Sequence, residues 1–509
     1  MRFPLNRPSH WILLALLSTI AYWPITLNKR DFLYRDPELL QHCQQNPYCR
    51  HNLLFFPIQL VAEHGDTWSY IYPIEYLFKQ GVYWDDYRTP GYGAPYAVFR
   101  LITGSPEVSL WLLALLQVIL WAASIGLMLF YLQRRGVPTA WLIGLNFLLC
   151  FSPLAYHTRI LGTETLTAAL TILGTLLLFQ RQFFLAGIAF TWVFFLRPLN
   201  GIYVPLIGVW IIYTERKLLS KSLAYFALPF ILLEGAWIGR NFLFHGDFRP
   251  FFGSKSLNYP FLLARSDIYV LRYAYAIGEG EISKRSEAGN IHNILTCHSF
   301  TPASLEGIRQ AVPAWAFGEG CTPESLQKAA VLGCELAHSI TYSIDPPESL
   351  YYGKVYKNLE YVVMHFAPTP EDCEKELKMV QLLDRCIKCA KKNSGSIDIW
   401  VQKWLKMLGS IAYRPGFSDK IMNPKRLLVK KVYYYIYFLA TLAAILSAVF
   451  MLFQSREGRL VAVLYLAPIL AHLVLGYLER RYVDLLFSVG GLEIGLFLAW
   501  LRSGKVGRA

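Results

Sequence analysis

Charged residues are scarce in this chain of 509 residues. Asp, Glu, Lys and Arg together make up 17% of the sequence, whereas apolar residues make up 54%. Soluble globular proteins carry about 25% charged residues, so this composition excludes an ordinary soluble enzyme and predicts an integral membrane protein. Internal repeats and low-complexity tracts are also lacking, so the chain is interpreted from its apolar runs and its loops.

A cleavage site is lacking as well. The first apolar run has no Ala-x-Ala-like motif, and it ends in Tyr22-Trp23-Pro24. Aromatic residues at such a position are typical of a membrane interface rather than of a signal-peptidase substrate. We therefore expect this run to remain in the protein as its first membrane span.

Ten long runs with almost no charge predict an all-α membrane protein. In lipid the backbone polar groups must be satisfied inside a helix, and about 20 residues cross the bilayer. The runs are 11–27, 109–132, 138–156, 165–179, 183–196, 199–213, 222–239, 432–453, 460–477 and 483–501. The fifth and sixth are short and separated only by Arg197-Pro198, so a re-entrant hairpin is an alternative for this pair.

Lys and Arg are concentrated in one set of loops. With a cytoplasmic N-terminus, the inner segments hold thirteen Lys and Arg and only two Glu. Because positive loops face the cytoplasm, we expect both termini to be cytoplasmic in a multi-pass protein of the bacterial inner membrane. The net charge of +14 is then mostly a topology signal, and no nucleic-acid partner is needed to explain it. A basic cluster at 425–431 falls on the outer side, where a long translocated loop is largely exempt from the rule.

Two outer regions are large enough to hold a functional site, the first exoplasmic loop at 28–106 and a late domain at 240–431. They divide the chain into an N-terminal transmembrane module (1–239), an exoplasmic domain (240–431) and C-terminal transmembrane helices (432–509). In the exoplasmic domain, apolar residues have helical spacing at 323–338, 349–365 and 370–391. A basic amphipathic stretch at 397–408 is expected to lie flat on the membrane.

Eight of the nine cysteines fall in the outer regions, and Cys150 alone falls in a span. An even number on the exoplasmic side is typical of a disulfide-forming compartment. Cys43 and Cys49 are close enough in sequence to close a small loop. Cys386-Ile-Lys-Cys389 is an alternative half of a zinc site, but a second CxxC motif is lacking. Disulfides are therefore favoured over a metal.

The first exoplasmic loop contains Gly65-Asp66 and, further on, Arg88-Thr89-Pro90-Gly91-Tyr92. Asp66 precedes an aromatic stretch that predicts an interfacial helix, so a helix N-cap is the alternative role for this residue. Pro90 and Gly91 predict a tight bend with Arg88 at its rim. The alternative for Arg88 is a structural ion pair with Asp85 or Asp86.

Three further segments bring charge to the outer membrane boundary. Glu164 stands at the mouth of a span, where a carboxylate is costly unless it caps, pairs or takes part in function. The alternative is a helix capped by Thr163, with Glu164 in its first turn. Arg240 ends the seventh span, and Glu479-Arg480-Arg481-Tyr482 lies between spans nine and ten.

Together these segments resemble the GT-C superfamily of polytopic glycosyltransferases that use lipid-linked sugars. The likeness is to its family-39/83-like branch, kin to protein O-mannosyltransferases and lipid A aminoarabinose transferases. It rests on Gly65-Asp66, the 88–92 turn, Glu164-Thr165-Leu166, Arg197-Pro198, the segment 237–248 and Glu479-Arg480-Arg481-Tyr482. The chain departs from the pattern in having Thr67 instead of a second acid, and in its Cys-containing domain.

The resemblance implies a GT-C-type bundle of about ten transmembrane helices. It also implies an inverting transfer of a sugar from polyprenyl phosphate to an acceptor hydroxyl at the exoplasmic face. A glycosyl phosphate suits a weak carboxylate base, because its leaving group is a stable anion once a cation holds it. The implied partners are the polyprenyl-phosphate sugar, a lipid, glycan or protein acceptor, and membrane lipids. No cofactor is implied, and a divalent metal is not predicted.

The resemblance also assigns roles to single residues. Asp66 would be the general base, and Glu164 would orient the acceptor or tune Asp66. Arg88 would stabilise the leaving lipid phosphate. The further phosphate-binding candidates are Arg240, Arg480 and Arg481, and the residues expected to line the sugar pocket are Tyr70 and Tyr92.

Two other functions compete with this interpretation. An O-antigen polymerase or ligase also has many spans and a large late loop, but it does not need an acidic first loop of about eighty residues. A transporter or lipid flippase is expected to have polar sites at mid-membrane and related halves. Here the spans show no such symmetry, and their mid-span charges are few, chiefly Glu234 and Glu493.

Overall fold

The computed structural model describes a largely helical chain, as the all-α prediction requires. The described residues are 7–26, 62–63, 67–80, 89–217, 220–245, 269–270, 272–274, 276–277, 291–295, 302–343, 370–393, 424–475 and 480–503, together with Leu5 and Cys297. These residues include a parallel pair of short strands, β1 (Ala62–Glu63) and β2 (Ile160–Leu161), which the sequence did not predict.

Each of the ten apolar runs contains a helix. The helices are α1 (Pro8–Thr26), α6 (Pro106–Arg134), α7 (Thr139–Cys150), α8 (Pro153–Tyr156), α9 (Thr163–Phe179), α10 (Phe183–Leu196), α11 (Tyr203–Glu215), α12 (Lys221–His245), α21 (Pro424–Met451), α22 (Arg456–Leu475) and α23 (Arg480–Ser503). The third run is divided between α7 and α8, because Ser152 caps a new helix that begins at Pro153.

Two helices of the described chain are long and apolar enough to cross a membrane by length and composition, Val108–Arg134 and Lys221–Leu243. Four more helices are apolar but shorter: Thr139–Cys150, Thr163–Phe179, Phe183–Leu196 and Tyr435–Met451. This is weak evidence for a membrane association. The number of spans and their orientation stay predictions.

Helix α6 packs between α1 and α9 in the bundle. Ser105 caps it by accepting a hydrogen bond from the Val108 backbone N–H, and Pro106 begins it, which is the favoured chemistry for a helix start. Gly126 allows α1 to approach closely, because a Cβ there would lie 2.5 Å from the backbone of Ile12. Small residues at helix contacts are typical of packed membrane helices.

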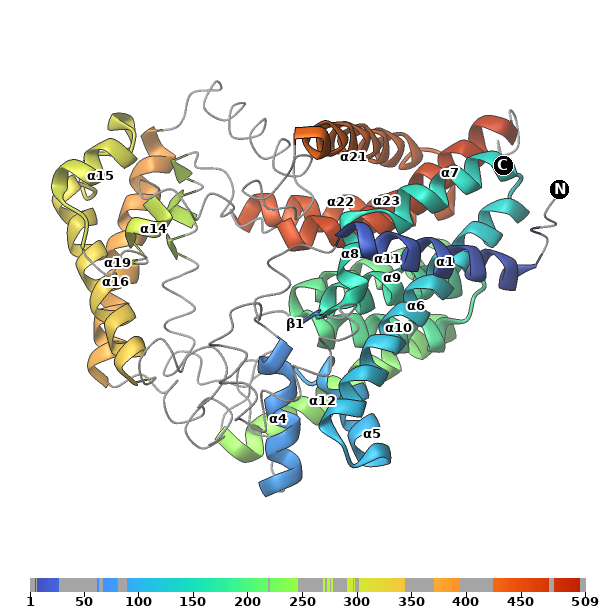
Figure 1. Cartoon of the computed structure of the whole chain (residues 1–509), viewed down its shortest axis with the longest axis horizontal. Coiled ribbons are helices and arrows are strands. Elements are labelled where there is room, and N and C mark those ends of the chain that lie inside the picture. The colour runs from blue at the N-terminus through green and yellow to red at the C-terminus, as the bar shows by residue number, and fades with distance from the viewer. Residues whose placement is uncertain are drawn as a thin grey trace.

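The bundle has two ends (Figure 1). One holds the start of α1 and the end of α23 and is called here the terminus end. There Trp11 Nε1 donates to Gln133 Oε1 at 2.9 Å, and Arg135 pairs with Glu457. These contacts join segments that the sequence assigns to the cytoplasmic side. The other end contains β1 and β2 and is called the strand end.

Two helices fall within the predicted first outer loop, α4 (Thr67–Gln80) and α5 (Gly93–Thr103). They are joined by polar contacts. Glu75 of α4 accepts hydrogen bonds from Tyr96 Oη at 2.5 Å and from Arg100 Nε at 2.9 Å. Helix α4 is thus held against α5, which is followed directly by α6.

A second hydrophobic core belongs to the region 240–431, drawn apart from the bundle in Figure 1. Its elements are α14 (Ile291–Leu295), α15 (Leu305–Ala311), η5 (Ala314–Ala316), α16 (Pro323–Ser343) and α19 (Pro370–Asn393). The last two confirm helices predicted from apolar spacing. The stretches 349–365 and 397–408 lie outside the described residues. Both proposed domain boundaries fall inside helices, since α12 continues to His245 and α21 begins at Pro424.

Candidate functional site

The strand end joins the predicted first outer loop to the segment that carries Glu164. Ala62 pairs with Ile160 and Glu63 with Leu161, in parallel register. Beyond this pair, the first segment leads to α4 and the second to α9. Two segments that are about 100 residues apart in sequence are therefore paired at the strand end.

Glu164 lies in the first turn of α9 and is only 5% exposed. Its Oε1 accepts a hydrogen bond from Nη2 of Arg197, which is 8% exposed. Arg197 Nε also donates to Thr163 Oγ1 at 2.8 Å. The helix N-terminus favours a negative charge in this position. Glu164 is therefore a buried carboxylate that forms an ion pair with Arg197.

The helix cap differs from the simple alternative drawn from the sequence. Gly162, not Thr163, is the N-cap of α9, so the hydroxyl of Thr163 is available to Arg197. Gly162 has a steric role, because a Cβ at this position would lie 2.6 Å from Glu164 Oε2. The absence of a side chain at 162 leaves room for the carboxylate.

The predicted bend at Pro90 and Gly91 is present, and it is docked on the end of α10. Ala94 N–H donates to the Pro90 carbonyl at 2.7 Å, which closes the turn. Thr89 Oγ1 donates to the Phe195 carbonyl at 2.5 Å, and Trp192 Nε1 donates to the Gly91 carbonyl at 2.8 Å. This places the turn against the residues that lead into Arg197.

Gly91 explains how the turn comes so close. A Cβ there would lie 2.3 Å from the carbonyl carbon and oxygen of Phe195. Both atoms are backbone and cannot rotate away, so a larger residue would push the turn off α10.

A buried polar relay connects the same turn to β2. Tyr92 Oη donates to Gln117 Oε1 at 2.7 Å, and Gln117 Nε2 donates to the Ile160 carbonyl at 2.9 Å. Both side chains are fully buried. Burial raises the pKa of the Tyr92 hydroxyl well above its usual value, and the charge of Glu164 raises it further. Tyr92 therefore remains a neutral donor.

Tyr70 and Tyr92 lie together, with ring centroids 5.4 Å apart. Both are buried, Tyr70 at 7% exposure and Tyr92 at 0%. Their contact links α4 to the turn, and the Tyr92 hydroxyl is already used by Gln117. Their assignment to a sugar pocket stays a prediction.

Aromatic contacts connect Arg240 to the end of α10, on which the 89–92 turn is docked. Its guanidinium carbon is 5.0 Å from the Trp237 ring centroid, and Trp237 stands edge-on to Phe195 at 6.4 Å. Arg240 Nη1 also donates to Asn241 Oδ1 at 2.8 Å. The end of α12 is thus packed on the end of α10, beside the docked turn.

Other predicted site residues fall outside the part of the chain that the structure describes. Asp66 and Arg88 lie wholly outside it. For Arg480 and Arg481, the backbone is described but the side chains are not. Gly65, Cys43 and Cys49 are outside it as well. The roles of these residues stay predictions.

Arg197, Arg159 and Gln117 were assigned no role from the sequence. Arg197 is the partner of Glu164, although it is 33 residues away. Arg159 is 1% exposed in η2 (His157–Arg159). The sequence could have indicated a buried partner for Arg197, because it is the only charged residue between positions 182 and 214.

Four cysteines of the region 240–431 form two disulfides, Cys297–Cys334 and Cys321–Cys386. This confirms the preference for disulfides in that region. Because Cys386 is bonded to Cys321, its sulfur is not a thiolate ligand for a metal. In the described ranges, no three His, Cys, Asp or Glu side chains gather as a metal site.

Comparisons of the chain with protein-family models, with curated proteins and with solved structures found no match.

Proposed function

We propose that the chain is an inverting glycosyltransferase of GT-C type. It moves a sugar from a polyprenyl-phosphate-linked donor to an acceptor hydroxyl at the exoplasmic face of the inner membrane. The helices of the ten apolar runs form the membrane part, with the terminus end in the cytoplasm and the strand end outside. The Arg and Lys of the terminus end agree with this orientation.

The β1–β2 pairing is the observation that carries the proposal. Asp66 follows Glu63 by three residues, and Glu164 follows Leu161 by three residues. Glu63 pairs with Leu161, so the segment that precedes Asp66 in sequence is joined at β1 and β2 to the segment that precedes Glu164. This pairing supports a shared site for the two predicted acids, which come from loops far apart in sequence.

The proposed chemistry uses a base and a cation. Asp66 takes the proton of the acceptor hydroxyl, and the oxygen of that hydroxyl attacks the anomeric carbon of the donor sugar. The bond to the donor phosphate breaks on the opposite face, and the polyprenyl phosphate leaves as an anion stabilised by Arg88. Arg240 is the second cation candidate, because it lies at the corner where the 89–92 turn is docked.

Glu164 is better suited to positioning than to proton transfer. Its charge is compensated by Arg197, and the pair is almost closed to solvent, with side-chain exposures of 7% and 9%. A carboxylate held this way fixes the 160–164 segment and, through it, β2 and β1. We therefore propose Asp66 as the base and the Glu164–Arg197 ion pair as the contact that positions it.

The test is sugar transfer by the full-length protein in nanodiscs, with radiolabelled polyprenyl-phosphate hexoses and pentoses as donors. Membrane glycolipids and envelope proteins serve as acceptors. Asp66→Asn should lower turnover by about 10² or more, as loss of a positioned base does, while donor binding remains. Arg88→Ala should weaken donor binding. Asp85→Asn is the matched control and should transfer normally.

Near-normal transfer by Asp66→Asn would reduce Asp66 to a helix cap and would make Asp85 or Asp86 the next candidate base. Absence of transfer from every polyprenyl-phosphate donor by the wild-type protein would reject the function itself.

A further inference from the structure

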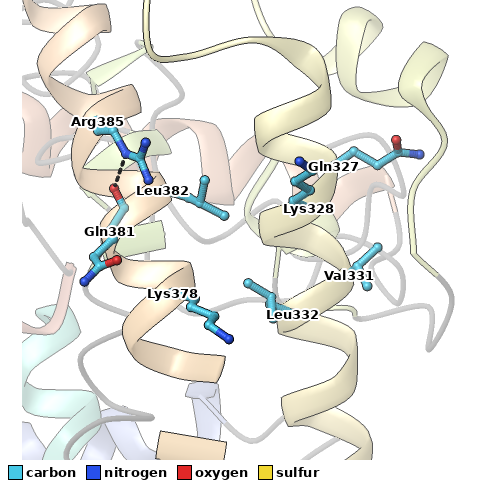
Figure 2. Close-up of a pocket in the computed structure, with 8 residues that line it drawn as sticks. All are labelled: Gln327, Lys328, Val331, Leu332, Lys378, Gln381, Leu382 and Arg385. Carbon is cyan, nitrogen blue, oxygen red and sulfur yellow. Dashed lines mark hydrogen bonds between the residues drawn. The ribbon is translucent and has the colours of Figure 1, made fainter. Parts of the chain in front are cut away.

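The late exoplasmic region contains a groove between α16 and α19, separate from the residues of the strand end (Figure 2). Its volume is about 440 Å³, within the range of about 300–1,000 Å³ that is typical of specific ligand sites. The lining residues are Gln327, Lys328, Val331, Leu332, Lys378, Gln381, Leu382 and Arg385.

The two walls of the groove are fixed to each other. The Cys321–Cys386 disulfide joins α19 to the residues that immediately precede α16. Further along the helices, Lys375 Nζ lies 3.4 Å from Glu335 Oε2. The helices are antiparallel, with the disulfide beyond one end of the groove and the ion pair beyond the other. A preformed site of this kind costs little ordering entropy on binding.

The groove combines an apolar floor with a basic rim. Aliphatic side chains from both helices form the floor and are only half-buried. Lys328 lies on α16, and Lys378 and Arg385 lie two turns apart on α19 (Figure 2). Among the described residues, no carboxylate lines the groove.

The rim cations are available to a ligand. Arg385 donates from Nε to the Gln381 carbonyl at 3.3 Å, which uses one of its five N–H groups. Lys378 pairs with Glu374 at 2.8 Å, but both side chains are more than half exposed. Exposed pairs of this kind contribute little and exchange readily.

We propose that this groove binds an acidic amphipathic helix of a partner protein. All eight lining residues come from two helices, so the groove is walled on two sides and a third helix would complete the layer. Apolar residues at i, i+3 or i+4 and i+7 would cover the floor, and flanking Asp or Glu would meet the three cations. A lipid surface fits less well, because aromatic anchors typical of membrane interfaces do not line the groove.

The experiment uses the full-length protein in phosphatidylcholine nanodiscs. The probe is a fluorescein-labelled synthetic helix with Leu at every third or fourth position and Glu on both flanks. A peptide of the same composition with a scrambled order is the peptide control. Saturable binding of the patterned peptide is expected, and it should weaken with salt because the cations are exposed.

Two variants locate the site. Lys328→Glu combined with Arg385→Glu, and separately Val331→Asp, should each weaken peptide binding at least tenfold. Lys391→Glu combined with Lys392→Glu is the matched control, since it makes the same charge change in the last turn of α19 outside the groove. Mass spectrometry of the Cys321–Cys386 link verifies that each variant is folded. Glycosyl transfer is not required for this binding, so the two proposals fail separately.

Three results would overturn the assignment. One is the absence of saturable binding below about 100 µM, a free energy of only about −5 kcal/mol. Another is equal binding by the wild type and the Lys328, Arg385 variant. The third is loss of peptide binding when phosphatidylglycerol is added to the nanodisc, which would identify an anionic lipid as the occupant.

Discussion

The strand end and the terminus end of the bundle each contain an Arg–Glu ion pair, but the two pairs differ in burial. At the strand end the side chains of Arg197 and Glu164 are 9% and 7% exposed. At the terminus end those of Arg135 and Glu457 are 47% and 24% exposed. A buried pair is weak evidence for stability, because an apolar replacement often stabilises as well or better. The presence of such a pair at the strand end, beside the docked 89–92 turn, therefore points to function.

The largest effect is expected from breaking the buried pair on one side only. Arg197→Met should destabilise the protein by about 3–5 kcal/mol, because it leaves the Glu164 carboxylate buried without its partner. Adding Glu164→Leu should recover most of that loss without recovering sugar transfer. Equilibrium unfolding in mixed micelles measures the first effect, and the transfer assay measures the second. Unchanged stability of Arg197→Met would contradict the ion pair.

The second effect tests the docking of the turn on α10. Gly91→Ala should cost about 3 kcal/mol, the upper range for overpacking, because its Cβ would meet the Phe195 backbone at 2.3 Å. Gly144→Ala is the control, since nothing lies within 4 Å of its Cβ position in α7. That change should be neutral or slightly stabilising. Equal unfolding midpoints for the two variants would show that the turn does not touch α10.

The third effect compares two glutamines of α6, one at each end of the bundle. Gln117→Leu removes a partner from Tyr92 and from the Ile160 carbonyl and should cost about 2 kcal/mol. Gln133→Leu should cost less, because Trp11 Nε1 keeps its second acceptor, the Leu5 carbonyl, at 3.0 Å. If Gln117 positions β2 for catalysis, Gln117→Leu lowers kcat with little change in KM, while Gln133→Leu changes neither. A larger stability loss for Gln133→Leu would reverse the comparison.

The sequence predicted what local chemistry determines. Uncharged runs located the helices, and Pro90 with Gly91 located the turn. Glu164 was placed in the first turn of a helix because carboxylates favour that position. These features depend on neighbouring residues, and the structure agrees with them.

The contacts that assemble the strand end were not predictable in this way. β1 and β2 have two residues each, too few for an alternating pattern. The pairing of Arg197 with Glu164 joins the end of α10 to the start of α9. The spacing of these residues in the sequence does not indicate that they pair. Disulfide connectivity has the same limit, since many pairings of the same cysteines are compatible with one sequence.

The smallest effect is expected at the terminus end, and it completes the comparison. Arg135→Ala removes the cation from Glu457, but water reaches both side chains, and Tyr131 Oη still donates to Glu457 at 2.8 Å. The change in unfolding free energy should therefore be below about 1 kcal/mol, as for exposed pairs, and it should shrink further at high salt. Sugar transfer should be unaffected. A loss as large as that of Arg197→Met, in the same micelles and at the same salt, would show that the two pairs serve the same structural purpose. Burial at the strand end would then no longer mark a functional site.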